Sequence, residues 1–371
     1  MLRTMLQSVP DDTKPEGAQA PSTAPARETI LTIAGLRKTF GAFTALDGID
    51  LKIAEGEFLT IVGPSGSGKT TLIRILAGME EPTEGAVLLR NTRIEKVPAN
   101  QRPTCMVFQS LALFPHRSVG ENIEFPLKIR GTDRAERKTR ALELLELLRL
   151  PADYYAKRIH ECSGGERQRI ALARALAFDP EILFFDEPLS ALDYRLRKTL
   201  EKELKDLHSR TGKTFVYITH SLEEAMVMSD RIAIMRAGQF EQIGTPNDIY
   251  TRPRSRFVAE FMGEVNLFPL TAEAGSALRL APGVVDTKAG GLLMARPEVL
   301  RFLSAGQSAP VEVEGKLEAE YNLGGRLQYT VSTGIGPVTV EVLRDQRPAA
   351  AIGAQVRLGT DPADCHLIAD A

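Results

Sequence analysis

Short apolar runs recur along the first part of the chain, and they have the length and composition of buried β-strands. Each is bounded by turn or charged residues and is partly β-branched or aromatic. The clearest examples are Phe58–Val62, Ile182–Phe185 and Phe215–Ile218. Runs of this kind, separated by stretches of a different period, predict the strands of an α/β sheet.

The intervening sequence shows helical periodicity. Apolar residues recur at Ala141, Leu144, Leu145 and Leu148, with the spacing i, i+3, i+4, i+7 of one helix face. Basic and acidic residues occupy the other positions, as on a solvated surface. The pattern therefore predicts an amphipathic helix between two of the strands.

Both ends of the chain differ from this central pattern. Residues 1–28 are rich in Pro, Ala, Ser and charge, which predicts a disordered tail, with ordered sequence beginning near Leu31. Past about Gly263, short β-prone runs alternate with Gly-rich breaks, which predicts a small all-β domain. These runs are Pro310–Val313, Leu327–Val331 and Pro337–Val342.

Composition narrows the classes of function. A chain of 371 residues favours two or three domains at ~150 residues each. The net charge of -2, from 46 basic and 48 acidic residues, gives no bulk attraction to nucleic acid or an anionic membrane. The 3 cysteines are widely spaced, and we expect them to be reduced thiols. No apolar run approaches the ~18 residues of a membrane span, and no signal-peptide pattern follows Met1. A role at a membrane would therefore require a membrane-spanning partner.

A phosphate-binding loop follows the first predicted strand. It reads Gly63, Pro64, Ser65, Gly66, Ser67, Gly68, Lys69, Thr70. This matches G-x-x-x-x-G-K-[ST], and a strand before it and a helix after it are the context that the pattern requires. Glycines let backbone N–H groups approach phosphate oxygens beside a helix N-terminus. Lys69 is placed to reach the β- and γ-phosphates and the Thr70 hydroxyl to hold Mg²⁺, with Thr71 in the same segment. The sequence predicts ATP or GTP binding rather than a chance Gly/Ser turn.

Two adjacent carboxylates end the second strand. Asp186 and Glu187 directly follow Ile182–Phe185. P-loop proteins use a carboxylate at the C-terminal edge of a strand to support Mg²⁺, and we assign that role to Asp186. Glu187 lies one residue further on, where it can orient attacking water or accept its proton. Without the phosphate loop, the same pair would be an ordinary strand end.

A second candidate anion site lies shortly before the acid pair. Ser163, Gly164 and Gly165 precede Glu166 and a helical pattern. Ser163 fits a helix N-cap, and the glycines would expose backbone N–H groups. One nucleotide needs only one phosphate loop, so a second cradle predicts a site completed by another subunit. A symmetric pair would do this, each chain lending its cradle to the ATP of its neighbour.

At this point the sequence resembles the ATP-binding-cassette (ABC) ATPases, whose signature usually reads Leu-Ser-Gly-Gly-Gln. Here Cys162 replaces leucine and Glu166 replaces glutamine, while the Ser-Gly-Gly that meets phosphate is intact. The resemblance spans roughly Leu31 to Met262, with every motif in the family's order. It implies an ATPase domain at residues 29–262, with a P-loop α/β core and an inserted helical subdomain at about 110–180.

The resemblance assigns roles to four further residues. Phe40 matches the aromatic residue that stacks on adenine, although it could instead belong to the core. Gln109 matches the residue that contacts Mg²⁺ or water and senses the membrane partner. Asp193 matches the loop that crosses the dimer interface, and His220 the switch histidine at the γ-phosphate. Taken alone, Gln109 would be a surface amide and His220 a satisfied core or surface histidine.

The C-terminal region resembles the accessory barrel of importer ATPases for sugars, polyamines, sulfate and iron. This rests on Ala295-Arg296-Pro297-Glu298 and the β-rich remainder, and it implies an OB-like barrel at residues 263–371. Within that group, residues 192–198 and 261–266 look most like the spermidine/putrescine importer ATPases. We therefore expect polyamine import, with ferric iron, sugar or sulfate as alternatives.

The implied reaction is Mg²⁺-dependent hydrolysis of ATP, coupled to opening and closing of a membrane permease. The implied partners are a second copy of the chain, the permease subunits and, indirectly, an extracytoplasmic solute-binding protein, at the cytoplasmic face of the inner membrane. No nucleic acid is expected. A soluble ABC ATPase acting on DNA or ribosomes is disfavoured by the near-neutral charge. A P-loop small-molecule kinase would have no use for residues 163–165.

Overall fold

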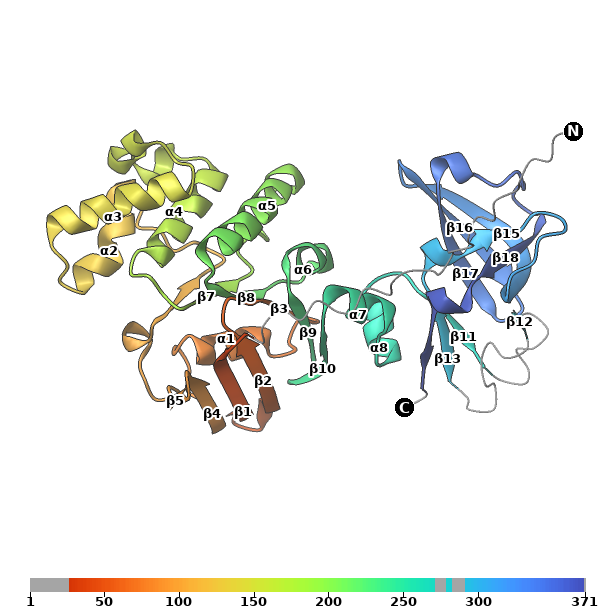
Figure 1. Ribbon diagram of the computed structural model, residues 1–371, viewed down its shortest axis with the longest axis horizontal. Coiled ribbons are helices and arrows are strands. Elements are labelled where there is room, and N and C mark those ends of the chain that lie inside the picture. Colours follow the sequence, from red (N-terminus) through yellow and green to blue (C-terminus); the bar gives the residue numbers. More distant parts are fainter. Residues whose placement is uncertain (1–26, 271–277, 282–290, 370–371) are drawn as a thin grey trace, which may run out of the picture.

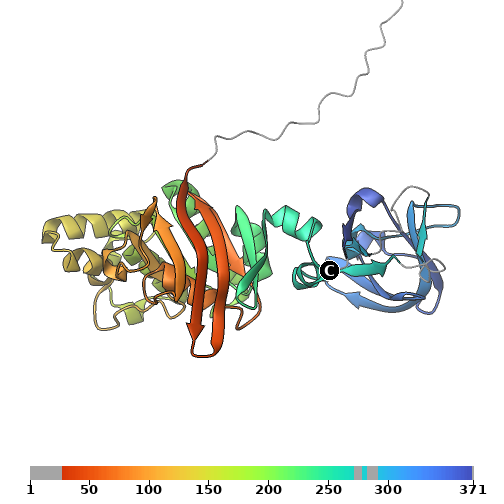
Figure 2. The same ribbon diagram turned by 90° about the horizontal axis from the view of Figure 1, so that it is seen from below.

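The computed structural model describes residues 27–270, 278–281 and 291–369. Figure 1 shows an α/β body and an all-β body, with α7 (Pro246–Thr251) and α8 (Arg256–Phe261) between them. Figure 2 shows the same order along the long axis of the molecule. The tail predicted at residues 1–28 lies outside the described residues, apart from residues 27 and 28.

The α/β body is built on a mainly parallel sheet. Its strands are β3 (Phe58–Val62), β6 (Thr104–Val107), β7 (Ile182–Asp186), β8 (Thr214–Ile218), β9 (Arg231–Arg236) and β10 (Gln239–Gly244). Their order is β10-β9-β3-β8-β7-β6, and only the pair of β10 with β9 is antiparallel. The three strands predicted from apolar runs are confirmed as β3, β7 and β8. Every residue of β3 and β8 is buried, which explains why neither run alternates with polar residues.

A second sheet covers one side of the first. It consists of β1 (Thr29–Phe40), β2 (Phe43–Ala54), β4 (Glu84–Leu89) and β5 (Thr92–Arg93), in the order β2-β1-β4-β5. Helix α1 (Lys69–Leu76) lies between the two sheets in Figure 1. Leu72, Ile73, Ile75 and Leu76 of α1 are buried in a cluster that also takes residues from both sheets. This packing holds the start of α1 at the end of β3.

The remaining helices of the α/β body cover the other side of the central sheet and extend beyond it. They are α2 (Val119–Ile129), α3 (Arg134–Leu147), α4 (Gly164–Leu176), α5 (Tyr194–Thr211) and α6 (Leu222–Met228). Figure 1 shows α2, α3 and α4 grouped together, within the range expected for the helical subdomain. The predicted helix is confirmed as α3: Ala141, Leu144 and Leu145 are buried in it, and Leu148 packs directly after its end.

The C-terminal body is all-β and is formed by antiparallel strands. One sheet joins β11 (Asn266–Pro269), β13 (Leu292–Ala295) and β19 (Cys365–Ile368). The other joins β14 (Arg301–Phe302), β18 (Gln355–Thr360), β15 (Val311–Asn322), β16 (Arg326–Thr333) and β17 (Gly336–Leu343), and β12 (Leu278–Leu280) pairs with β15. Both sheets contribute to one hydrophobic cluster. The runs predicted as strands lie in β15, β16 and β17, apart from Pro310, which precedes β15.

Short 3₁₀ helices occur at Ala99–Gln101, Ala152–Ala156, Ile159–Glu161, Pro297–Val299, Arg344–Gln346 and Pro362–Asp364. The domain boundary expected between residues 262 and 263 falls between α8 and β11.

Within the described ranges, no helix combines the length and hydropathy needed to cross a bilayer. Cys105, Cys162 and Cys365 are free thiols. The fold class is the predicted one, an α/β core with a helical subdomain followed by a small all-β domain.

Candidate functional site

The loop between β3 and α1 forms a cradle in which packing requires glycine at both ends. A Cβ on Gly63 would lie 2.1 Å from the Met235 carbonyl oxygen, and one on Gly68 would lie 2.5 Å from the Ala45 carbonyl oxygen. Gly68 also has a φ of 104°, which favours glycine. Gly66 has open space around its ideal Cβ position. The loop is thus packed tightly at both ends and open in the middle.

Lys69 begins α1 and turns back across this loop. Its Nζ donates hydrogen bonds to the carbonyl oxygens of Gly63 (2.8 Å) and Pro64 (2.9 Å) and lies 3.5 Å from Ser67 Oγ. Burial lowers the pKa of Lys69, whereas two nearby carboxylates raise it. A buried ammonium beside the unpaired N–H groups at the start of a helix is suited to bind an anion.

The other predicted loop residues differ in exposure. Residues 64–66 are exposed at the surface of the loop, and Ser67 is buried. Thr70 and Thr71 are half-buried in the first turn of α1. The hydroxyl of Thr70 therefore belongs to the same helix turn as the ammonium of Lys69.

The acid pair lies at the carboxyl end of β7. Asp186 is its last residue, and Glu187 follows with a φ of 47°, a left-handed conformation that is uncommon for a residue with a side chain. The Glu187 N–H donates to the Ile218 carbonyl oxygen at 3.0 Å, which fixes this turn to the end of β8. Burial first, and then the Glu187 carboxylate, raise the pKa of Asp186, whereas Arg74 and Lys69 lower it. The two acids thus share a partly dehydrated site with the Lys69 ammonium.

His220 lies at the end of the neighbouring strand, β8. Because β7 and β8 are adjacent and parallel, their carboxyl ends meet at one edge of the sheet. Nδ1 of His220 lies 3.2 Å from Oε2 of Glu187. The structure therefore brings together Lys69, Asp186, Glu187 and His220, which the sequence predicted from separate motifs.

Gln109 follows β6 and is connected to the acid pair through a serine. Its Nε2 donates to Ser190 Oγ at 3.1 Å, and Ser190 Oγ donates to the Glu187 carbonyl oxygen at 2.9 Å. The sequence reasoning assigned no role to Ser190. Its place three residues after Glu187 was the available signal, since a hydroxyl at that spacing can bond back across a turn.

Three of the predicted residues carry oxygen atoms of the kind that bind a divalent cation. Thr70 supplies a hydroxyl, Asp186 a carboxylate and Gln109 an amide oxygen. Mg²⁺ is usually bound by one or two carboxylates together with substrate phosphates. The pKa of Asp186 is raised because its charge is buried beside a second carboxylate, and a cation at this place would compensate that charge. These residues fit Mg²⁺ delivered with a nucleotide.

Ser163 is the N-cap of α4, which confirms the prediction from sequence. Its Oγ accepts the Glu166 N–H at 3.3 Å, and Glu166 Oε2 accepts the Ser163 N–H at 2.7 Å, forming a capping box. Tyr154 Oη donates to Glu166 Oε1 at 2.8 Å. Glu166 therefore accepts the Ser163 N–H, a hydrogen bond that the amide oxygen of the usual glutamine could also accept. Cys162 is buried in the core of the α/β body, and its Sγ donates to the Arg158 carbonyl oxygen at 3.4 Å.

Gly164, Gly165 and Asp193 meet at the start of α5. A Cβ on Gly165 would lie 3.0 Å from Cδ1 of Leu196. Asp193 is the N-cap of α5, and its carboxylate accepts the Leu196 N–H at 3.0 Å. The second cradle is therefore packed beside the segment that was predicted to cross a dimer interface.

Phe40 is the last residue of β1 and stands in solvent. It is 48% exposed, and Lys38 Nζ lies 4.8 Å from the ring centroid. This exposure makes the core alternative wrong. The ring is free to stack on a planar ligand, and adenine stacking stays a prediction.

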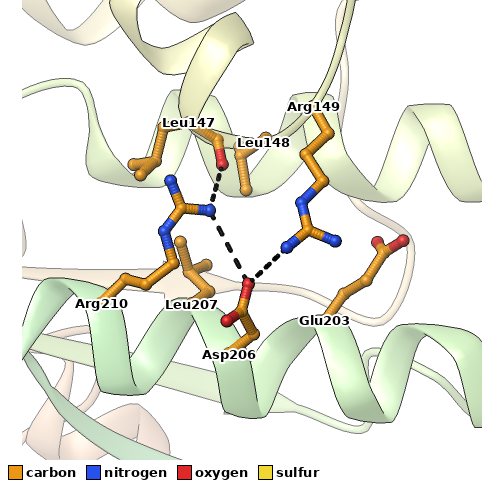
Figure 3. Close-up of a pocket in the computed structure, with 7 residues that line it drawn as sticks. All are labelled: Leu147, Leu148, Arg149, Glu203, Asp206, Leu207 and Arg210. Atoms are coloured by element: carbon orange, nitrogen blue, oxygen red, sulfur yellow. Dashed lines mark hydrogen bonds and ion pairs between the residues drawn. The ribbon is translucent and has the colours of Figure 1, made fainter.

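A small hollow between α3 and α5 is separate from these residues. Figure 3 shows Asp206 between two arginines: its Oδ2 lies 2.9 Å from Nη2 of Arg149 and 3.7 Å from Nη1 of Arg210. Arg210 also donates to the Leu147 carbonyl oxygen at 3.1 Å. The cavity, of about 20 Å³, has room for little more than one water molecule. These contacts join the helical subdomain to α5.

Hydrolysis of a nucleoside triphosphate needs a cradle for the phosphates, ligands for a cation and an acid that can orient water. One edge of the central sheet carries all three, on a strand-loop-helix unit and on two adjacent strand ends. Fold and site thus define the class of the molecule as a P-loop nucleotide hydrolase.

Comparison with known proteins narrows this class. The family model described as ABC transporter matches residues 46–190, and that described as TOBE domain matches residues 293–368. The chain is 50% identical over 243 residues to the spermidine/putrescine import ATP-binding protein of Roseobacter denitrificans, covering 66% of this chain and 67% of the relative. It is 41% identical over 327 residues to the Fe(3+) ions import ATP-binding protein of Rhizobium etli, covering 84% and 90%. Among solved structures, a dimeric post-hydrolysis state of an ATP-binding cassette with ADP and phosphate matches with a TM-score of 0.52 and 33% identity, over 58% of this chain and 99% of the other.

The chain belongs to the ABC transporter family, as one of its ATP-binding proteins. It is an ATP-binding and ATP-hydrolysing enzyme, and its C-terminal domain is a TOBE domain. The resemblance inferred from the sequence motifs is thereby confirmed.

Proposed function

We propose that this chain is the ATPase subunit of an importer for a polyamine such as spermidine or putrescine. The observation that carries the catalytic part is the contact of His220 with Glu187, at the sheet edge where Lys69 begins α1. The cargo part is supported by the spermidine and putrescine relative of Roseobacter denitrificans. The proposed cargo also rests on the resemblance of residues 192–198 and 261–266 to the spermidine/putrescine importer ATPases.

The phosphates of ATP bind at the open middle of the cradle. Lys69 Nζ exchanges its bonds to the carbonyl oxygens of Gly63 and Pro64 for bonds to phosphate oxygens. Thr70, Gln109 and Asp186 would hold Mg²⁺, and the ion would supply positive charge to the phosphates. An ammonium that is already buried needs little further dehydration to meet the nucleotide, so its charge acts strongly.

Glu187 orients the attacking water, or accepts its proton, in front of the γ-phosphate. His220 lies against the Glu187 carboxylate and would contact the same phosphate. Both side chains belong to strand ends that the Glu187 N–H joins through the Ile218 carbonyl oxygen. The reacting groups are thereby positioned by the sheet before the nucleotide arrives, which is how electrostatic positioning lowers a barrier.

A second copy of the chain completes each site. Within one chain, Ser163 and Asp193 cap α4 and α5, and their side chains bond to those helix starts. The capping bonds use the N–H groups of Ser163 and Glu166, so the N–H groups of Gly164 and Gly165 are the ones that a partner's ATP can use. The dimeric cassette with ADP and phosphate, at 33% identity, supports such a pair.

A membrane permease is the other partner. An open hollow of about 450 Å³ lies beside Phe108, the residue before Gln109, between the core and the helical subdomain. Its lining is largely apolar, and Met79 and Ile129 of that lining are 46% and 67% exposed. An apolar segment of a permease at the cytoplasmic face of the inner membrane fits this hollow. Through the permease, the ATPase would respond to an extracytoplasmic solute-binding protein.

Ferric iron is the second candidate cargo. The iron-import relative of Rhizobium etli is 41% identical to this chain and aligns over 84% of it, which supports this cargo as well. The ATPase does not touch the cargo, so its own residues do not decide between the two.

Uptake measurements decide it. Cells that lack this gene would be supplied with labelled spermidine, putrescine or ferric iron, with the wild-type chain or Glu187→Gln returned on a plasmid. We expect polyamine uptake to be restored by the wild-type chain and not by the variant. Polyamine uptake that does not change on deletion, together with lost iron uptake, would refute the polyamine proposal and leave the importer assignment intact.

A further inference from the structure

A buried carboxylate is hydrogen-bonded to Thr219, the residue before His220, and has no role in the chemistry proposed above. Glu224, in the first turn of α6, is 2% exposed. Its Oε2 accepts hydrogen bonds from Tyr217 Oη and Thr219 Oγ1, both at 2.8 Å. Buried carboxylates are rare unless their charge is compensated, so this placement calls for an explanation.

The pattern around Glu224 is a capping box in sequence but not in structure. At α2 and α4, the glutamate three residues after the capping serine accepts the N–H of that serine, at 2.7 Å in both helices. At α6 the sequence is also Ser-x-x-Glu, but the Ser221 N–H donates to Thr219 Oγ1 at 2.9 Å instead. Thr219 Oγ1 therefore accepts the N–H that the glutamate of a capping box would accept. The Glu224 carboxylate is buried instead.

These hydrogen bonds fix the residues on both sides of His220. Thr219 Oγ1 donates to Glu224 and accepts from Ser221, so the residues on both sides of His220 are held by one hydroxyl. The Thr219 N–H donates to the Ile61 carbonyl oxygen at 3.4 Å, which ties the same turn to the end of β3. The side chain of His220 itself is largely exposed, so its direction depends on the backbone of this turn.

The other carboxylate oxygen of Glu224 faces the segment of Asp193. Oε1 lies 4.0 Å from Nε of Arg197, and Arg197 Nη2 donates to the Leu192 carbonyl oxygen at 2.9 Å. Arg197 therefore connects Glu224 to the backbone just before Asp193. Burial raises the pKa of Tyr217 well above its usual range, so Tyr217 stays a hydrogen-bond donor to Glu224.

We propose that Glu224 is a positioning residue that holds the Thr219–Ser221 turn so that His220 meets Glu187. The inference rests on the role proposed for His220. The supporting contacts are the two hydroxyl bonds to one carboxylate oxygen and the bracketing of His220 by Thr219. Loss of such support misplaces a reacting group without removing it, and misplacement lowers kcat more than it changes substrate binding.

A double-mutant cycle on the full chain tests this. Glu224→Ala should lower kcat for ATP hydrolysis on the order of 10-fold or more, with KM little changed. Glu224→Gln keeps an oxygen that accepts from both hydroxyls, so it should retain more activity. In a His220→Ala background, Glu224→Ala should have almost no further effect, because residues that act through one another are non-additive.

Matched variants separate positioning from loss of stability. Thr219→Val keeps the size of the side chain but removes the hydroxyl that bonds to Glu224 and Ser221, and it should show the same non-additivity even where Glu224→Ala does not fold. Glu201→Gln is the control, since Glu201 is equally buried but is paired with Lys198 on α5. It should leave kcat near the wild-type value.

The outcomes are distinguishable. Defects of Glu224→Ala and Thr219→Val that multiply fully with that of His220→Ala would overturn the positioning inference alone. A His220→Ala chain that hydrolyses ATP at the wild-type rate would overturn the role proposed for His220 and this inference with it. Neither result would bear on the cargo or on the phosphate cradle.

Discussion

Replacing Arg296 with methionine would test how the TOBE domain is held to the ATPase domain. Arg296 follows β13 and is 3% exposed. Its guanidinium donates to the carbonyl oxygen of Tyr250 in α7, at 3.0 and 3.3 Å, and to those of Ala259, Gly263 and Glu264, at 3.0, 3.3 and 3.1 Å. The Tyr250 and Ala259 carbonyls lie in the last turns of α7 and α8, where a helix leaves its carbonyls unpaired, and Gly263 and Glu264 follow the end of α8. One side chain of the TOBE domain therefore caps both connecting helices.

The magnitude follows from these contacts. Methionine keeps the apolar stem but leaves four carbonyl acceptors without their donor, each worth ~1 kcal/mol. Burial lowers the pKa of Arg296, so the guanidinium itself is dehydrated, and removing it offsets part of the loss. We expect a net loss of about 2–3 kcal/mol, a fall in melting temperature of roughly 5–10 °C for domains of this size.

Thermal unfolding and limited proteolysis at the α7–α8 connection provide the assay. ATP hydrolysis should stay near the wild-type rate, because none of the Arg296 contacts involves the nucleotide site. Arg296→Lys should fall between, since an ammonium cannot reproduce the planar fork. Arg301→Met is the control, because the Arg301 side chain is exposed and forms a surface ion pair with Asp361. An unchanged melting temperature in Arg296→Met, or an equal fall in the control, would refute the reasoning.

Three further predictions concern the nucleotide site. Glu187→Gln should bind ATP but lose ~10²–10⁴-fold in kcat, and normal turnover would contradict its role. Lys69→Ala should already fail to bind ATP, and normal ATP affinity would contradict the role of Lys69. Asp186→Asn should raise the melting temperature of the nucleotide-free protein at neutral pH, because a pKa raised in the folded state means that ionisation destabilises the fold. The gain should vanish as the pH falls through that raised pKa, and a gain independent of pH would contradict it. In mixed dimers of Ser163→Arg with Lys69→Ala, both defects fall on one composite site, so nucleotide trapping should find one working site; two equally dead sites would exclude sharing.

Local signals made much of the fold predictable. β3 and β8 are apolar throughout because both faces are covered, and the phosphate loop has a fixed sequence between a strand and a helix. Ser163 could be recognised as an N-cap because the bond it makes spans only three residues. Such features depend on neighbours in sequence, and the change to an all-β domain is visible in short β-prone runs between Gly-rich breaks.

Contacts across the fold were not predictable in the same way. The bond from Gln109 to Ser190 joins segments after two different strands, and no local pattern announces it. The pattern Ser-x-x-Glu occurs at α2, α4 and α6, yet only Glu224 leaves the cap for the core. Its choice depends on Tyr217 and Thr219, hydroxyls that face the same buried space.

Strand order explains why the catalytic groups meet in an order different from that of the chain. Along the sequence, Lys69 comes first, then Gln109, Glu187 and His220. In the sheet, β8 lies between β3 and β7, with β6 beyond β7. Because all four strands are parallel, their carboxyl ends share one edge, and His220 falls between the phosphate loop and the acid pair. The histidine can therefore contact Glu187 from the side of Lys69, while Gln109 approaches from the far side through Ser190. A different order of the same strands would keep every motif and still separate these groups, so the activity depends on the topology as much as on the motifs.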